Sequence, residues 1–139
     1  MGVIITSNNA SISFDCSYSG FYNLRKNIAI LYDMEFGEHY GKLINCRTKE
    51  DYEKFDNKAN EICKRLPDED SDILDFFFQP DTEGKINYKT CGKLYEIIKD
   101  VDFGNRIFLY SAYSDGKDYE YFKDFLKECY SHRRNLIWY

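Results

Sequence analysis

The chain lacks long runs of apolar residues. A transmembrane helix needs roughly 20 consecutive apolar residues, and no stretch of the 139-residue sequence approaches that length. Residues 1–10 also lack the basic start and the apolar stretch of a secretory signal peptide. We therefore expect no membrane partner and a cytoplasmic location.

Cysteine pairs and histidines are scarce. The five cysteines are widely spaced and include no CxxC pair, a pattern typical of reduced, buried thiols in a cytosolic protein. Only two histidines are present, so a metal site around Glu35, Glu38 and His39 would need distant carboxylates. Segment 81–87 resembles the middle of an EF-hand loop, but Thr90 stands where the bidentate carboxylate is needed. We therefore predict neither a metal ion nor a cofactor.

The chain has no excess of positive charge. Its formal net charge is −5, and its densest group of cations is only Lys123, Lys127, Arg133 and Arg134. Non-specific binding to a phosphate backbone needs a basic surface. The composition therefore argues against a nucleic-acid track, while a local pocket for one small anion stays compatible with it.

Signature motifs of catalysis are missing as well. The sequence contains no GxSxG, P-loop or dinucleotide-binding fingerprint. No spacing selects a cysteine–histidine pair, and the 24 acidic residues are too many to single out two carboxylates. These features favour a binding protein over an enzyme.

Aromatic side chains are present in excess. The chain has 13 Tyr, 11 Phe and one Trp, against 24 Ile, Leu and Val residues together. Ala and Pro are rare while Asn, Lys and Ile are abundant, so the codon bias of an AT-rich genome is one explanation for the number of rings. Otherwise the core is unusually aromatic, or some rings face a ligand or partner. The rings that no predicted apolar face explains are Tyr18, Tyr22, Tyr110, Tyr113, Trp138 and Tyr139.

Hydrophobic periodicity predicts an α+β fold. Alternating residues indicate strands, and apolar residues at helical spacing indicate helices. The expected extended segments are a hairpin at 2–6 and 11–17, a short piece at 85–86, a strand at 107–113 and a closing strand at 136–139. The expected helices lie at 20–35, between Thr48 and Pro67, between Asp68 and Pro80, from Asn87 to Ile98 and from Tyr119 to Cys129. This order predicts a single domain, 1–139, with a small, mainly antiparallel sheet and about four to five helices packed on it.

Several helix ends carry local signals. Ser19 is the expected N-cap of the first helix, and Gly37 is its expected end. Thr48 and Asp51 form a capping-box pattern, with Asp in place of the usual Glu. Asn87 is the expected cap of the fourth helix.

Several segments carry a resemblance that spans nearly the whole chain. They are SGFYNLRKNIA, EFGEHY, DFF, GKINYKTCGKLYEIIKD and FKDFLKEC, with a tryptophan near the end. In these segments the chain resembles a family of small uncharacterised bacterial and phage-borne proteins. The resemblance implies a compact protein of mobile-element origin, and it implies no particular chemistry.

The junction between the second strand and the first helix is a candidate anion site. Backbone N–H groups and the helix dipole favour a phosphate or carboxylate there, and an arginine adds charge-assisted hydrogen bonds. The predicted ligand-binding residues are Ser17, Ser19, Gly20, Phe21, Tyr22 and Arg25. The same residues also suit an ordinary capped helix, and that alternative stays open.

The C-terminal segment is the second candidate. Arg133 and Arg134 lie close in sequence to Trp138, and such cationic and aromatic groups together recognise nucleotides. Tyr113 completes the predicted ligand-binding set. Trp138 suits the core or a subunit interface equally well, so a homo-oligomer is an alternative.

Together these features predict a non-enzymatic cytosolic binding protein. In the leading hypothesis it is a phage-encoded antagonist of host defence that sequesters a small anionic, nucleotide-like signal. One alternative is an acidic protein-interaction module that inhibits a host defence enzyme by direct binding. The other is a small enzyme with an unrecognised site.

Overall fold

The computed structural model describes residues 2–7, 13–101 and 117–139, and within the last range it describes side chains from residue 119 onward. The helices are α1 (Tyr18–Tyr32), α2 (Met34–Tyr40), α3 (Lys49–Cys63), α4 (Ser71–Phe78), α5 (Tyr88–Ile98) and α6 (Lys117–His132), with short 3₁₀ helices η1 (Gly41–Asn45) and η2 (Asp68–Asp70). The strands are β1 (Gly2–Ser7), β2 (Ser13–Ser17), β3 (Gly84–Ile86) and β4 (Leu136–Trp138). The protein has an α+β fold, as predicted.

The strands form one antiparallel sheet in the order β2-β1-β4-β3. The predicted hairpin is confirmed, with Val3 opposite Cys16. The closing strand is confirmed too, because β4 pairs with both β1 and β3 and places Trp138 opposite Ile5 and Gly84. The strand predicted at 107–113 lies outside the described residues.

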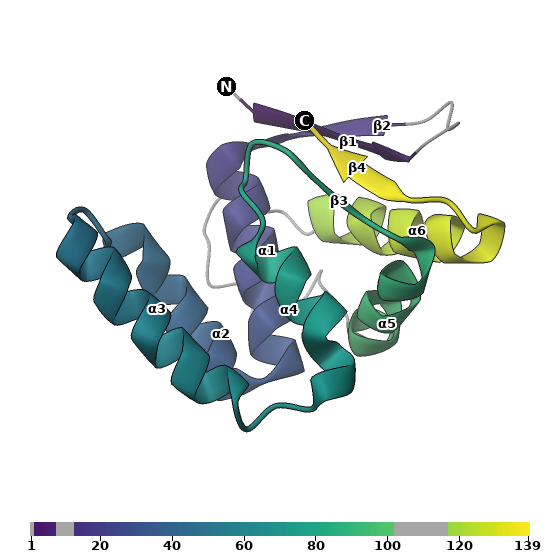
Figure 1. The fold of residues 1–139 in the computed structure, drawn as a ribbon. Coiled ribbons are helices and arrows are strands. Elements are labelled where there is room, and N and C mark those ends of the chain that lie inside the picture. The colour runs from purple at the N-terminus through teal and green to yellow at the C-terminus, as the bar shows by residue number, and fades with distance from the viewer. Residues whose placement is uncertain (1, 8–12, 102–116) are drawn as a thin grey trace.

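The described helices lie on one side of the sheet (Figure 1). Val3 and Ile5 in β1 are buried while Ile4 between them is 37% exposed, so one face of the strand packs on the helices and the other faces outward. Figure 1 also shows α2 and α3 as a pair of helices that extends away from the sheet. Within the described part of the chain, no helix combines the length and apolar character needed to cross a membrane.

Two predictions at the first helix are wrong. The N-cap is Ser17 rather than Ser19, since the Ser17 hydroxyl accepts from the Gly20 amide at 3.0 Å and the helix begins at Tyr18. The helix ends at Asp33, whose extended backbone breaks it and whose carboxylate caps α2. Gly37 therefore ends no helix. It lies inside α2, where a Cβ atom would overlap the backbone of Ile30 in α1.

The other predicted caps are confirmed. Thr48 and Asp51 form a reciprocal capping box at the start of α3. The Asn87 side chain accepts from the Thr90 amide and caps α5. Both signals act within a single turn of the chain, so neighbouring sequence is enough to specify them.

The core is aromatic. Trp138 is fully buried, with its ring centroid 5.3 Å from that of Phe21 and 5.8 Å from that of Phe76. Phe76 also stacks on Phe122 at 6.0 Å. Tyr52 on α3 is an exception, with 46% of its surface exposed. Much of the aromatic excess thus fills the interior.

Candidate functional site

A cavity of about 380 Å³ opens where the start of α1 meets η1 and α3. Its lining residues are Tyr18, Ser19, Tyr22, Leu43, Ile44, Cys46, Arg47, Tyr52 and Asp81. The sequence therefore brings together four separate segments here: the first turn of α1, the η1 region, the start of α3 and the turn before β3. We call this cavity the α1 pocket.

Arg25 lies behind the α1 pocket rather than in it. Its side chain is only 2% exposed and forms an ion pair with Asp81, which lines the pocket. Its Nη1 atom donates to the carbonyl oxygens of Phe76 at 2.9 Å and Gln79 at 2.8 Å. Those carbonyls belong to the last turn of α4. The final carbonyl oxygens of a helix have no hydrogen-bond donor within that helix. Arg25 thus caps the C-terminal end of α4.

Arg47 supplies the cation that lines the pocket. Its Nη1 atom donates to the carbonyl oxygens of Ile44 at 2.5 Å and Cys46 at 3.0 Å, which fixes the side chain against the backbone. Among the described residues, neither Nε nor Nη2 of this guanidinium has a hydrogen-bond partner. The sequence analysis did not select Arg47, because nothing in the local pattern distinguishes it from other exposed arginines.

Tyrosine rings form much of the pocket wall. The Tyr22 ring stacks on Tyr40 with centroids 5.3 Å apart, and its hydroxyl donates to the Tyr40 carbonyl oxygen at 2.8 Å. Burial raises the pKa of Tyr22 to about 12, so its phenol is neutral at neutral pH. Tyr18 is half-buried and Tyr52 is exposed, so both offer ring surface to a molecule in the pocket.

The predicted residues of the first group separate into two sets. Ser19 and Tyr22 line the α1 pocket, and Ser17 with Gly20 forms the helix cap beside it. Phe21 is completely buried, and the Arg25 guanidinium lies 4.7 Å from its ring centroid. Phe21 and Arg25 were expected to contact a ligand, but both belong to the core that supports the pocket.

The C-terminal group does not assemble as predicted. Trp138 is fully buried, and its Nε1 atom donates to the Pro80 carbonyl oxygen at 2.9 Å, so its ring is not available to a ligand. Arg133 and Arg134 lie just beyond α6, and neither lines the α1 pocket. Arg133 is exposed and Arg134 is half-buried. Tyr113 lies outside the described residues.

A second groove with cationic and aromatic residues lies between α5 and α6. It has a volume of about 570 Å³. Its lining residues are Lys89, Gly92, Lys93, Tyr95, Glu96, Lys127, Tyr130 and Ser131. Lys93 is bound to Asp72 at 2.9 Å, and Glu96 is bound to Lys99 at 2.7 Å. This groove is the alternative to the α1 pocket as a candidate anion site.

Comparison of the chain with protein-family models, with curated proteins and with solved structures finds no match. A function for this protein is therefore inferred from the chemistry of its own residues.

Proposed function

We propose that this protein is a non-enzymatic binding protein that holds a small anionic, nucleotide-like ligand in the α1 pocket. The observation that carries the proposal is the position of Arg47 in the same cavity as the rings of Tyr18, Tyr22 and Tyr52. Nucleotide recognition commonly combines a flat aromatic surface with a guanidinium group.

The tyrosine rings provide the surface for a base. Stacking of one base on an aromatic side chain contributes about 1–3 kcal/mol in single-stranded nucleic-acid complexes. Tyr22 is only 7% exposed, and its stack on Tyr40 and its hydroxyl bond make it a fixed part of the pocket wall. The exposed Tyr52 ring is the surface that a ligand would cover.

The anionic part of the ligand is bound by Arg47 and the start of α1. The Nε and Nη2 atoms of Arg47 suit a phosphate or carboxylate, which they meet in a fixed fork geometry. The Ser19 hydroxyl adds a donor from the first turn of α1, where the helix dipole favours negative charge.

Asp81 determines which edge of a nucleotide base the pocket accepts. Its carboxylate lines the pocket and is held by Arg25 from behind. A carboxylate only accepts hydrogen bonds, so it favours a base that presents N–H groups. Arg25 is already paired with Asp81, so the Arg47 guanidinium is the lining cation that remains to meet an anion.

These groups suit recognition more than reaction. Arg25 and Asp81 are already paired with each other, and the buried Tyr22 phenol keeps its proton. The physiological role that fits this function best is that of a phage-encoded protein in the cytoplasm that removes a nucleotide signal of host defence.

A thermal-shift screen followed by calorimetry tests the proposal. Mono-, di- and cyclic nucleotides are the probes, because a ligand that binds only the native state raises the melting temperature. We expect at least one of them to bind, and Arg47→Ala to weaken its affinity about 10- to 100-fold, the value of a hydrogen bond to a charged group. Arg133→Ala is the matched control, because it removes an exposed arginine outside the pocket.

The outcomes separate the function from its site. If no nucleotide binds and none is released from the purified protein on denaturation, the proposed function is wrong. If Lys89→Ala with Lys127→Ala abolishes binding while Arg47→Ala does not, the function stands but the groove between α5 and α6 is the site. Conversion of the ligand with turnover would instead favour the enzyme alternative.

A further inference from the structure

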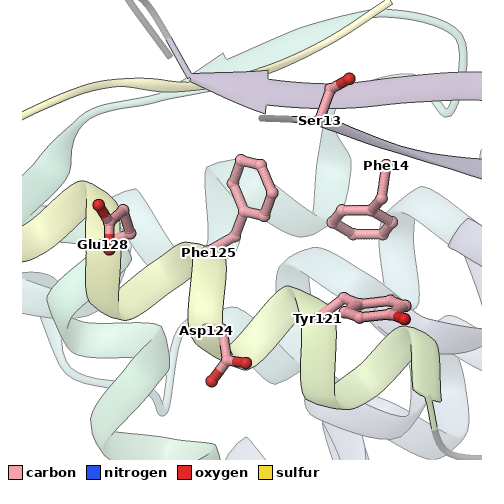
Figure 2. A pocket seen from close by; sticks show the side chains of 6 residues that line it. All are labelled: Ser13, Phe14, Tyr121, Asp124, Phe125 and Glu128. Atoms are coloured by element: carbon pink, nitrogen blue, oxygen red, sulfur yellow. The ribbon is translucent and has the colours of Figure 1, made fainter. Parts of the chain in front are cut away.

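A groove of about 500 Å³ lies between β2 and α6 on another part of the molecule (Figure 2). Its lining residues are Ser13 and Phe14 of β2 with Tyr121, Asp124, Phe125 and Glu128 of α6. Figure 2 shows the Phe14 ring extending from the strand toward Tyr121 and Phe125 on the helix. We call it the β2–α6 groove. It shares no lining residue with the α1 pocket.

Aromatic rings form the wall of this groove. The Phe14 centroid lies 5.4 Å from that of Phe125 and 6.1 Å from that of Tyr121. Phe125 is buried, Phe14 is half-buried and Tyr121 is 53% exposed. The groove therefore passes from the apolar core to an exposed ring whose face is accessible to a cation.

The charge in the groove is negative. Asp124 and Glu128 are one helical turn apart on α6, where like charges repel each other. Among the described residues, Asp124 has no ion pair or hydrogen bond, and Glu128 contacts only His132, at 3.2 Å. No lysine or arginine belongs to the lining. Two carboxylates beside aromatic rings suit the ammonium or guanidinium group of a basic side chain.

Among the described strands, the one beside the groove lies at the edge of the sheet. In the order β2-β1-β4-β3, β2 pairs with β1 on one side, and within the described ranges no strand pairs with its other side. Such an edge presents backbone N–H and C=O groups to an added strand. Side chains alternate across a sheet, so every second residue of an added strand would face α6, as Phe14 does.

We propose that the β2–α6 groove docks an extended basic segment of a partner protein. The segment adds to the sheet beside β2 and places a lysine or arginine between the rings and the carboxylates of Asp124 and Glu128. A second copy that docks through its own β2 is the less suitable occupant, because β2 contains Asp15 and no basic residue. This interaction is independent of nucleotide binding at the α1 pocket.

The test uses labelled peptides and fluorescence anisotropy. The probe is a short peptide in which lysine alternates with threonine, with an arginine version beside it. We expect binding that weakens with salt and falls about tenfold in Asp124→Asn with Glu128→Gln, since truncating charges of a docking site raises the dissociation rate. The control variant is Glu53→Gln with Asp56→Asn on α3, which changes net charge equally at exposed positions.

Backbone pairing needs its own measurement. N-methylation of every second amide removes the N–H donors along one edge of the peptide. Of the two peptides methylated at alternate sets of amides, we expect one to lose binding. Amide shifts in residues 13–17 and 121–128 on titration would locate the peptide.

Four binding results would overturn the proposal. They are no binding of either basic peptide, an equal loss in the α3 control, full binding of both methylated peptides, and stronger binding of spermidine than of the peptides. The last would identify a pocket for a small organic cation. Sedimentation of the free protein as a dimer that dissociates in Asp124→Asn with Glu128→Gln would assign the groove to a second copy and would also overturn it.

Discussion

Arg25 forms an ion pair with Asp81, and this contact joins the first helix to the turn between α4 and β3. The two residues are 56 positions apart in sequence. On one side of the pair the Arg25 guanidinium lies near the rings of Phe21, Phe76 and Trp138. On the other side Asp81 lines the α1 pocket. One ion pair therefore links the core to the candidate site.

Arg25→Ala should be strongly destabilising. Removing the guanidinium leaves the Phe76 and Gln79 carbonyls without their donor and Asp81 without its partner. We expect a loss of about 2–5 kcal/mol in the free energy of unfolding, because a large buried side chain is removed and two carbonyl acceptors lose a charged donor, measured by urea denaturation. Arg47→Ala should cost about 1 kcal/mol or less. Similar losses in the two variants would contradict the structural role of Arg25.

Gly37→Ala should destabilise the pair α1 and α2, because the new methyl group would overlap the backbone of Ile30. We expect a loss of about 1–3 kcal/mol, as in other overpacked cores, read from the urea midpoint. Gly41→Ala is the control. Its methyl group meets only the flexible end of Lys26, at 3.0 Å, so its stability should change by about 0.5 kcal/mol or less. A neutral Gly37→Ala variant would show that the helices do not pack this closely.

Asp33 should make stability depend on pH. Hydrogen bonds from Arg65 and from the Phe36 amide hold the pKa of this carboxyl below its usual value. Because the folded pKa is depressed, the stabilisation is present above the usual pKa and is lost as pH falls through the folded one.

Asp33→Asn tests this dependence, since asparagine still caps α2 but carries no charge. Arg65 is 47% exposed, so we expect a loss of only about 0.5–1 kcal/mol at neutral pH. The difference from wild type should shrink as the pH falls below the usual aspartate pKa of about 3.9, as followed by urea titrations. Parallel stability curves across that range would show that the ion pair contributes nothing.

The cysteines should react slowly in the native state. Cys16, Cys46, Cys91 and Cys129 are buried, and Cys63 is half-buried with its pKa raised by burial. Thiolates are the reactive form, and the raised pKa slows Cys63, but as the least buried thiol it should still be modified first. Cys46, which lines the α1 pocket, should follow, and the other three should react only on unfolding. Cys63→Ser should remove the fastest phase. Rapid native-state labelling of Cys16, Cys91 or Cys129 would disagree with the structure.

Local sequence predicted the elements whose signals lie within one turn. The capping box of Thr48 and Asp51 and the cap at Asn87 are of this kind. Ser17 and Ser19 are both good caps in isolation, so local sequence could not choose between them; the start of α1 follows directly from the end of β2, and this favours Ser17. Gly37 looked like a helix end because its real constraint, the contact with Ile30, comes from another helix.

The candidate site was predictable only in part. The start of α1 was a reasonable choice, and Ser19 and Tyr22 do line the α1 pocket. Arg25, which was predicted to contact the ligand, lies in the core, while Arg47, which was not predicted, lines the pocket. The local sequence around the two arginines does not distinguish one role from the other. What separates them is that the open end of α4 reaches Arg25 and needs its hydrogen bonds.

The sequence by itself determined the α+β class, most helix positions, the hairpin and the aromatic character of the chain, since periodicity and capping are local properties. Only the tertiary structure decided which rings are enclosed and which are accessible. Trp138 lies in the core because β4 enters the sheet between β1 and β3, whereas Tyr52 and Tyr121 remain exposed on helix surfaces. Burial depends on contacts between segments far apart in sequence, and those contacts exist only in the folded chain.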